Sequence, residues 1–156
     1  MSLLADFVAR TLQTAAPATA ATTAAVAACG ALENDSSAAP VNAVSHIAWG
    51  DEAAEHDELS AKYTLTGAAL NAAAITSWAA VYELGFGRAA RNGNVSRALL
   101  GGVATAAAAY VVDYHVVPRR LTPGFEKRLS SPSMFAAYAA LAASLPLASL
   151  MRSKQR

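Results

Sequence analysis

The chain has 156 residues, of which 54% are hydrophobic and 15% are charged, and its formal net charge is +1. This length fits one domain, and a charged fraction below the roughly 25% of an ordinary soluble domain favours a protein that lies in the lipid bilayer. The near-neutral charge excludes a basic face for nucleic acid, and the single cysteine excludes an intramolecular disulfide or a cysteine metal cluster.

Four alanine-rich segments are each close to the roughly 20 apolar residues that a helix needs to cross a bilayer. The alternation of polar and apolar residues that marks a strand is not found in the sequence. We therefore predict an all-α fold, an integral membrane four-helix bundle in a single transmembrane domain, with a short helical polar cap on one side. The helices are expected at 3–32, 62–87, 98–117 and 132–151, and the cap at 33–61 and 118–131.

The first segment, 3–32, gains least from lipid because its uncharged part is mostly alanine and threonine. Pro17 is expected to kink this helix. Residues 26–29 resemble a lipoprotein cleavage box, so a signal peptide is the rival interpretation. We predict a retained membrane helix, because threonines dilute the apolar region and the basic start of a signal peptide is poor here.

Capping residues and prolines mark the limits of the other helices. Ser60 is placed to cap the second helix, and Ser131 followed by Pro132 is a cap and first-turn pair for the fourth. Pro118 ends the third helix, and Pro146 interrupts the fourth near its end.

The distribution of basic residues slightly favours one orientation in the membrane. With the N-terminus inside, the cytoplasmic parts carry seven basic residues and the outer loops carry five. We therefore predict a multi-pass protein with both termini in the cytoplasm.

The two connections that share the outer side have opposite charge. Residues 33–62 carry seven acids and one base, whereas 118–131 carry four bases and one acid. Their net charges of −6 and +3 predict that the two connections meet in one cap. The alternative is two independently solvated loops, since exposed ion pairs are individually weak.

The cap holds most of the polar and aromatic residues. A short helix is expected between Pro40 and Gly50, and in it Asn42, His46 and Trp49 follow helical spacing and line one face. An amphipathic helix that lies on the membrane, with Trp49 at the interface, is the alternative.

A second short helix is expected directly after the first. Asp51 is placed to cap it, with Glu52 and Glu55 in its first turns.

Three runs of sequence stand out in this pattern. They are AAPVNAVSHIAWGDEAA at 38–54, WAAVYE at 78–83 and DYHVVPRRLTPGFEKRLS at 113–130. Together they resemble a family of small, uncharacterised four-helix bacterial inner-membrane proteins with PxNAxSHxxWGD and DYxVxPRRLTPGFE motifs. The resemblance implies four helices and the bacterial inner (cytoplasmic) membrane, and it implies no activity. Its motif positions are Asn42, Ser45, His46, Trp49, Gly50, Asp51, Tyr82, Glu83, Asp113, Tyr114, Pro118, Arg120, Pro123, Gly124 and Glu126.

The predicted site is a polar-cap site on the outer side. Its residues are Asn42, Ser45, His46, Trp49, Asp51, Asp113, Tyr114, His115, Arg119, Arg120 and Glu126.

Histidines and carboxylates in this site allow a metal or haem hypothesis. The set His46, Asp51 and His115 is of the kind that holds zinc, copper or iron, and Asp113 is the alternative to His115. Spacing weakens the hypothesis, because Asp113 and His115 are two residues apart and point to nearly opposite sides of a helix. The rival is a hydrogen-bonded structural cap.

Asp113 lies about one turn inside the third helix, where an ionised carboxylate is costly. We expect it to pair with Arg119 or Arg120 folding back over the helix end. The rival reading is a carboxylate that accepts a proton within the membrane.

The predicted intramembrane polar residues are Asn71, Tyr82 and Glu83. Glu83 lies near the cytoplasmic end, where Arg10 or Arg88 is expected to neutralise it. Asn71, midway along the second helix, is expected to form a hydrogen bond across a helix interface.

Small residues recur at helical spacing and predict close helix contacts. These faces also make a homodimer a hypothesis of its own. The residues are Gly67, Asn71, Ala74, Trp78 and Tyr82 in the second helix, and Gly101, Gly102, Thr105 and Ala109 in the third.

The sequence contains no nucleophile elbow, phosphate loop, zincin helix or dinucleotide fingerprint. We therefore expect a structural, accessory or binding protein rather than an enzyme. One alternative is a metal- or haem-binding protein centred on His46. The other is a small-solute or proton conduit that uses Asn71, Asp113 and Glu83.

Overall fold

The computed structural model describes residues 2–153, and within this range it contains helices and no strand. The predicted all-α fold is therefore confirmed for these residues. Three of the helices are long and apolar enough to cross a membrane. They span Leu3–Asn34, Val95–Val116 and Ser131–Met151.

The second predicted span, 62–87, is helical as well, but it does not belong to this group of three. Its main helix, α4, covers Thr66–Tyr82, and further helical turns extend it on both sides. Asn71 lies within it and Glu83 directly follows it, and each polar side chain has a cost in lipid. The extensions are η2 (Ala61–Leu65), η3 (Glu83–Gly87) and α5 (Arg88–Arg91).

The other described elements follow the predicted order. The longer ones are α1 (Leu3–Asn34), α6 (Val95–Val111), α7 (Ser131–Ser144) and α8 (Leu147–Ser153). The short ones are α2 (Ala39–Val44), α3 (His46–Trp49), η1 (Asp51–Glu55), η4 (Val112–Val116), η5 (Arg119–Leu121) and η6 (Phe125–Lys127).

Serine caps begin two of the helical segments. Ser60 precedes η2, and its Oγ accepts a hydrogen bond from the backbone N–H of Tyr63 at 3.0 Å, as predicted. The cap of α7 is Ser130 rather than Ser131, because it is the Oγ of Ser130 that accepts from the N–H of Ser133.

Prolines end or divide helices where the sequence indicated. Pro118 comes two residues after the end of η4, and Pro146 separates α7 from α8. Pro132 lies in the first turn of α7, where its missing N–H costs no helical hydrogen bond. The long helix α1 continues through Pro17.

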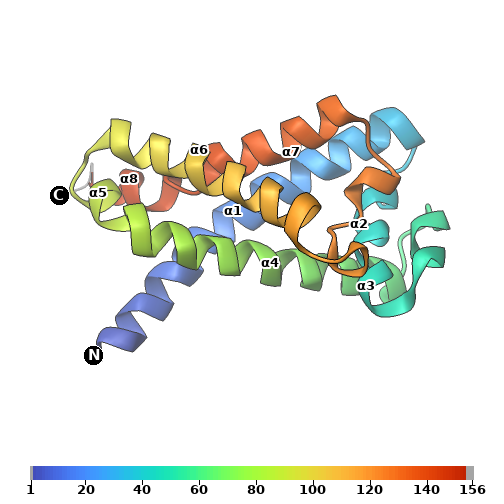
Figure 1. The fold of residues 1–156 in the computed structure, drawn as a ribbon, viewed down its shortest axis with the longest axis horizontal. Coiled ribbons are helices and arrows are strands. Elements are labelled where there is room, and N and C mark those ends of the chain that lie inside the picture. The colour runs from blue at the N-terminus through green and yellow to red at the C-terminus, as the bar shows by residue number, and fades with distance from the viewer. Residues whose placement is uncertain (1, 154–156) are drawn as a thin grey trace.

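The long helices run beside one another along the length of the molecule (Figure 1). Helix α1 packs against α4 and α7, and α6 packs against α7 and α4. Helices α2 and α3 lie at one end, and α5, α8 and the start of α1 lie at the other. The arrangement therefore gives the molecule one end built from the connections 35–60 and 117–130 and an opposite end that holds the start of α1 and α8.

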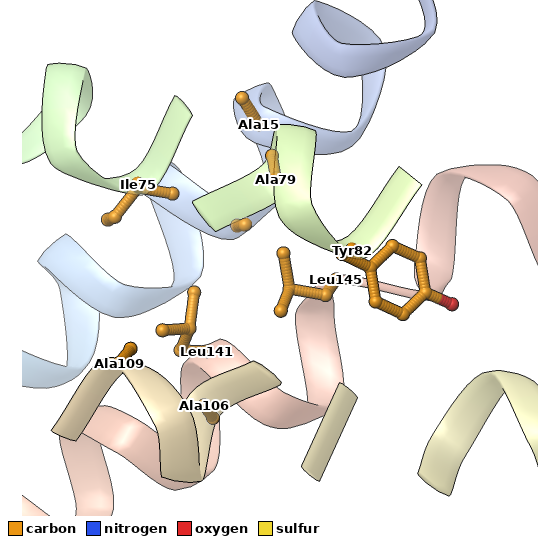
Figure 2. Packing of buried hydrophobic residues seen from close by; sticks show 9 residues of the cluster. Ala15, Ile75, Ala79, Tyr82, Ala106, Ala109, Leu141 and Leu145 are labelled. Carbon is orange, nitrogen blue, oxygen red and sulfur yellow. The ribbon is translucent and has the colours of Figure 1, made fainter. Parts of the chain in front are cut away.

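The centre of the helices is packed mainly with small side chains. Figure 2 shows Ala15 from α1, Ala79 from α4 and Ala106 from α6 near Leu141 and the residue that follows α7, Leu145. Because alanine is short, the helix backbones approach closely, and a Cβ added at Gly102 would lie 2.2 Å from the carbonyl oxygen of Ala142.

Most residues of the small-residue faces predicted for a homodimer pack against other elements of the same chain. A Cβ at Gly67 would lie 2.0 Å from the carbonyl oxygen of Val41, and one at Gly101 would lie 2.2 Å from the ring of Phe86. Thr105 and Ala109 are buried as well. Ala74 of the predicted faces is exposed, and the homodimer stays a prediction.

Candidate functional site

The two oppositely charged connections contact each other, as their net charges predicted. Lys127 forms an ion pair with Asp51, and Arg128 forms one with Asp57. These pairs join the segment between α1 and α4 to the segment between α6 and α7. We call this joined region, residues 33–61 and 118–131, the cap.

Arg128 makes the largest set of polar contacts between the two halves of the cap. Its Nε donates to Asn34 Oδ1 at 2.9 Å and its Nη1 to the carbonyl oxygen of Ala54 at 2.6 Å. Its backbone carbonyl accepts from Asn34 Nδ2 at 2.8 Å, and Asp57 holds its Nη2. The side chain of Arg128 is 17% exposed and holds the two halves of the cap together, so we call it the clamp of the cap. This role was not predicted from the sequence.

Glu33 provides a second unpredicted link. Its carboxylate accepts from the backbone N–H of Ser130 at 2.8 Å and from the hydroxyls of Ser130 and Ser133 at 2.5 Å each. A carboxylate at a helix N-terminus is favoured by the helix dipole, so Glu33 ties the end of α1 to the start of α7.

Asn42 is fully buried, and its side chain holds the connection between α1 and α4 together through hydrogen bonds. Its amide nitrogen donates to the carbonyl oxygens of His56 and Glu58, both at 2.9 Å, and its amide oxygen accepts from the hydroxyl of Thr64 at 2.6 Å. The side chain is thereby satisfied inside the cap, and its role is structural.

The short helix predicted between Pro40 and Gly50 is divided at Ser45. The Ser45 hydroxyl donates to the carbonyl oxygen of Asn42 at 2.7 Å, a local bond that competes with helical hydrogen bonding. α2 therefore ends at Val44 and α3 begins at His46.

The division corrects the prediction that three polar residues share one face. Asn42 and His46 are buried, whereas Trp49 is 46% exposed and donates from Nε1 to the hydroxyl of Thr66 at 3.2 Å. Lys62 Nζ lies 5.1 Å from the centre of the Trp49 ring, a cation–π contact at the surface.

Apolar side chains fix the underside of the cap to the helices. The cluster consists of Val26, Val41, Val44, Phe125, Leu129 and Ala137. Gly124 permits the approach of the two connections, because its φ is 85° and an added Cβ would lie 2.6 Å from the carbonyl oxygen of Ala43.

His46 joins the two connections through its ring. Its Nε2 donates to the carbonyl oxygen of Thr122 at 2.9 Å, since a carbonyl can only accept, and its Nδ1 lies 3.8 Å from Asp51 Oδ1. Asp51 is the first residue of η1 and makes no capping hydrogen bond there, which corrects its predicted role. Its carboxylate faces Lys127 instead.

A pocket of about 650 Å³ opens between the two connections. Six residues of the predicted polar-cap site line it together with Gly50, Thr122 and Lys127. The six are His46, Asp51, Tyr114, Arg119, Arg120 and Glu126. Asn42, Ser45, Trp49, Asp113 and His115 do not line this pocket.

The charged groups of the pocket differ in how far they are neutralised. Hydrogen bonding and the positive charge of Lys127 lower the pKa of Asp51, so this carboxylate is ionised at neutral pH. Glu126 lies 3.0 Å from the Thr122 hydroxyl, and Arg120 Nη2 makes a long contact of 3.4 Å with the carbonyl oxygen of Ile47. The Arg119 guanidinium has no hydrogen-bond or ion-pair partner among residues 2–153.

Asp113 does not form the predicted pair with Arg119 or Arg120. The hydroxyl of Tyr138 on α7 donates to its carboxylate at 2.7 Å. The backbone becomes extended at Val117, ahead of Pro118, so the arginines continue away from the helix rather than folding back. His115 lies against the ring of Tyr110, at 5.8 Å between ring centres.

The described residues do not assemble the predicted metal site. No group of three or more His, Cys, Asp or Glu between residues 2 and 153 is placed to hold a metal ion. His46 and Asp51 are neighbours, but the ring of His115 packs on Tyr110 outside the pocket. The haem hypothesis meets the same difficulty, because His46 is buried and its Nε2 is bonded to Thr122.

The three predicted intramembrane polar residues are each bonded to a neighbouring element. Glu83 is buried and pairs with Arg91 at 2.5 Å rather than with the predicted Arg10 or Arg88. It also accepts from the hydroxyl of Thr14 at 2.7 Å.

The other two predicted intramembrane polar residues also bond across helices. Asn71 donates to the hydroxyl of Thr23 on α1 at 3.2 Å, which confirms the predicted interhelical hydrogen bond. The Tyr82 hydroxyl donates to the carbonyl oxygen of Ala98 on α6 at 3.2 Å.

A second, mostly apolar cavity of about 80 Å³ lies between the helices below the cap. Among its polar lining residues are Thr22, Asn71 and Asp113. The Thr22 hydroxyl is buried and has no hydrogen-bond partner within the part of the chain that the structure describes. Glu83 does not line this cavity.

Comparison with known protein families, with curated proteins and with solved structures finds no match to this chain. The resemblance drawn from the three sequence runs therefore stays a prediction. The function has to be argued from the geometry of the cap and the helices.

Proposed function

We propose that this chain is a multi-pass protein of the bacterial inner membrane, folded as a four-helix bundle, whose outer cap binds a polar ligand. It acts as a binding or accessory protein without catalysis. Three helices of membrane-spanning length and composition support the membrane location. The fourth span in this proposal is the continuous helical segment 61–91, which contains α4.

The packing of α4 supports its assignment as a span. It lies along α1 and α6, both of which are apolar enough to cross a membrane. A helix with polar groups is tolerated in lipid where those groups bond to neighbouring helices, as Asn71 does with Thr23. Four spans place both halves of the cap on one side and both termini on the other, with the termini in the cytoplasm.

The observation that carries the binding role is the pocket between the two connections. Both halves of the cap contribute its walls, and Arg128, Glu33 and the apolar underside hold those walls together. A concave site whose walls are held in place is typical of a ligand site, and the polar lining of this one suits a polar ligand. Catalysis is not favoured, because Ser45, the serine next to His46, donates its hydroxyl hydrogen bond to the carbonyl oxygen of Asn42.

Cysteine labelling tests this proposal. In a Cys29→Ser background, single cysteines replace the exposed Leu59 and Leu121 in the two halves of the cap and the exposed Asn92 between α5 and α6. A membrane-impermeant maleimide added to intact spheroplasts is expected to label the two cap cysteines. Asn92→Cys is expected to react only after the membrane is permeabilised.

Two results would contradict the membrane proposal. One is labelling of the cap cysteines from opposite sides of the membrane. The other is release of the protein from membranes by an alkaline wash without detergent.

The cavity between the helices favours a second candidate, a site for a small solute or a proton. Its unpartnered Thr22 hydroxyl and its Asp113 carboxylate are the groups that such a solute would meet. A liposome flux assay compares the natural chain with Asp113→Asn, and this candidate requires flux above that of empty liposomes. A conduit that also uses Glu83 requires a further path, because Glu83 does not line this cavity.

A further inference from the structure

The cap pocket carries uncompensated positive charge. Arg119 and Arg120 are neighbours on η5 and both are exposed at the pocket, whereas Lys127 is already paired with Asp51. Besides His46, three cationic side chains and two carboxylates line the pocket, and one of these carboxylates, Glu126, lies beside the Thr122 hydroxyl. Two adjacent guanidinium groups with few protein partners are suited to an anion with several oxygens, above all a phosphate.

The acids of the first connection do not cancel this charge, because most have partners outside the pocket. Glu33 is bound by two serines, and Asp57 is bound by Arg128. Glu52 accepts from Tyr63 and Lys62, and these hydrogen bonds lower its pKa. The excess of positive charge is therefore local to η5, although the first connection as a whole is acidic.

Apolar surface adjoins the charged pocket. Val116, three residues before Arg119, is 67% exposed, and Leu121, directly after Arg120, is 53% exposed. Arginine beside exposed aliphatic side chains, at the end of a helix of membrane-spanning composition, is the arrangement expected where lipid headgroups meet a protein.

An apolar groove on the same helix gives the chains of a lipid a place to lie. It has a volume of about 580 Å³ and runs between α6 and α7, where Val103 and Phe135 are among its exposed lining residues. Tyr110 lines this groove, and its ring lies 5.3 Å from that of Tyr114, which lines the cap pocket. The charged pocket and the groove are therefore adjacent, with this pair of aromatic rings between them.

We propose that the cap pocket binds the phosphate of an anionic phospholipid. Arg119 and Arg120 contact the phosphate oxygens, and an acyl chain lies in the groove between α6 and α7. This assignment rests on the proposed membrane location, and it names the ligand of the proposed binding site. A soluble phosphate compound shares the headgroup chemistry, but the groove would then have no role.

Lipid binding to the full chain tests the assignment. Protein purified in a non-ionic detergent is titrated with phosphatidylglycerol, phosphatidylcholine or sodium phosphate, and bound species are measured by native mass spectrometry. The natural chain is expected to prefer phosphatidylglycerol to phosphatidylcholine. Replacing both arginines, as Arg119→Gln with Arg120→Gln, is expected to weaken phosphatidylglycerol binding about tenfold or more.

The matched control is Arg97→Gln, which removes an exposed arginine at the other end of α6 and is expected to leave binding unchanged. Equal affinity of the double variant and the natural chain for phosphatidylglycerol would overturn the assignment. Displacement of the lipid by sodium phosphate would also overturn it, by showing a site for soluble phosphate. Neither result would alter the cysteine labelling pattern, so failure of the lipid assignment is distinct from failure of the membrane proposal.

Discussion

The helices and the cap are held together by different interactions. Between the long helices, side chains such as Ala18, Ala79 and Ala109 are fully buried and make contact through their small size. In the cap, the two connections meet through hydrogen bonds and ion pairs, as Arg128 and Glu33 show. The first kind of contact depends on the shape of the backbone, and the second depends on particular pairs of polar atoms.

The proposed membrane location accounts for this difference. In lipid, apolar burial gives helices little reason to associate, so close backbone approach and van der Waals contact have to hold them together. The cap has a polar exterior, where buried polar groups must be paired and each unpaired one is costly. Substitutions that add bulk should therefore damage the helices most, and substitutions that remove polar atoms should damage the cap most.

The largest expected effect is at the contact between α6 and α7. Gly102→Leu places a side chain where even a Cβ would lie 2.2 Å from the carbonyl oxygen of Ala142, so the helices have to separate. We expect a loss of about 3 kcal/mol in the free energy of unfolding, measured by denaturant titration in detergent micelles. The matched control is Gly85→Leu, because a Cβ there meets no atom within 4 Å. Equal losses for both variants would show that helix separation is not the cause.

The next effect in size is at the clamp of the cap. Arg128→Met keeps the length of the side chain but leaves Asn34 Oδ1, the Ala54 carbonyl oxygen and Asp57 without this partner. We expect a loss of about 2 kcal/mol in the free energy of unfolding. Hydrogen exchange is expected to speed up in the cap while the amides of α6 and α7 remain protected.

Arg97→Met is the control for the clamp, since Arg97 is an exposed arginine outside the cap. It should change neither the stability nor the exchange pattern. If Arg128→Met speeds exchange in the long helices as much as in the cap, the two regions do not act separately.

The smallest effect concerns the exposed pair of Asp51 and Lys127. Because Lys127 lowers the pKa of Asp51 in the folded chain below its ordinary value of 3.8, the unfolded chain takes up a proton first as the pH falls. The stabilisation from this pair is therefore complete above about pH 5 and is lost at lower pH, as the carboxylate becomes protonated. Asp51 is 85% exposed, so solvent screens the pair and the effect stays small.

Comparison with Asp51→Asn isolates this pair. The difference in stability between the natural chain and the variant should be constant from neutral pH to about pH 5 and should shrink toward about pH 3. A difference that does not change with pH would mean that the ion pair makes no contribution. Denaturant titrations of both proteins over this pH range provide the measurement.

Local chemistry made several parts of the fold predictable. Ser60 and Pro146 act on the backbone next to them, so their effects on helix ends could be read without knowing the rest of the molecule. The contact between the connections followed from net charge, which does not depend on which acid meets which base. Residue partners were harder to predict, as Asp113 shows, because its carboxylate meets Tyr138 on a helix distant in sequence.

By itself, the sequence determined that the chain is helical, where its long helices begin and end, and that its two polar connections attract each other. These properties depend on neighbouring residues or on summed charge. Tertiary structure alone decided that Arg128 and Glu33 hold the cap and that His115 lies apart from His46. These outcomes depend on the direction in which each side chain leaves a packed backbone, which is set only when elements distant in sequence come together.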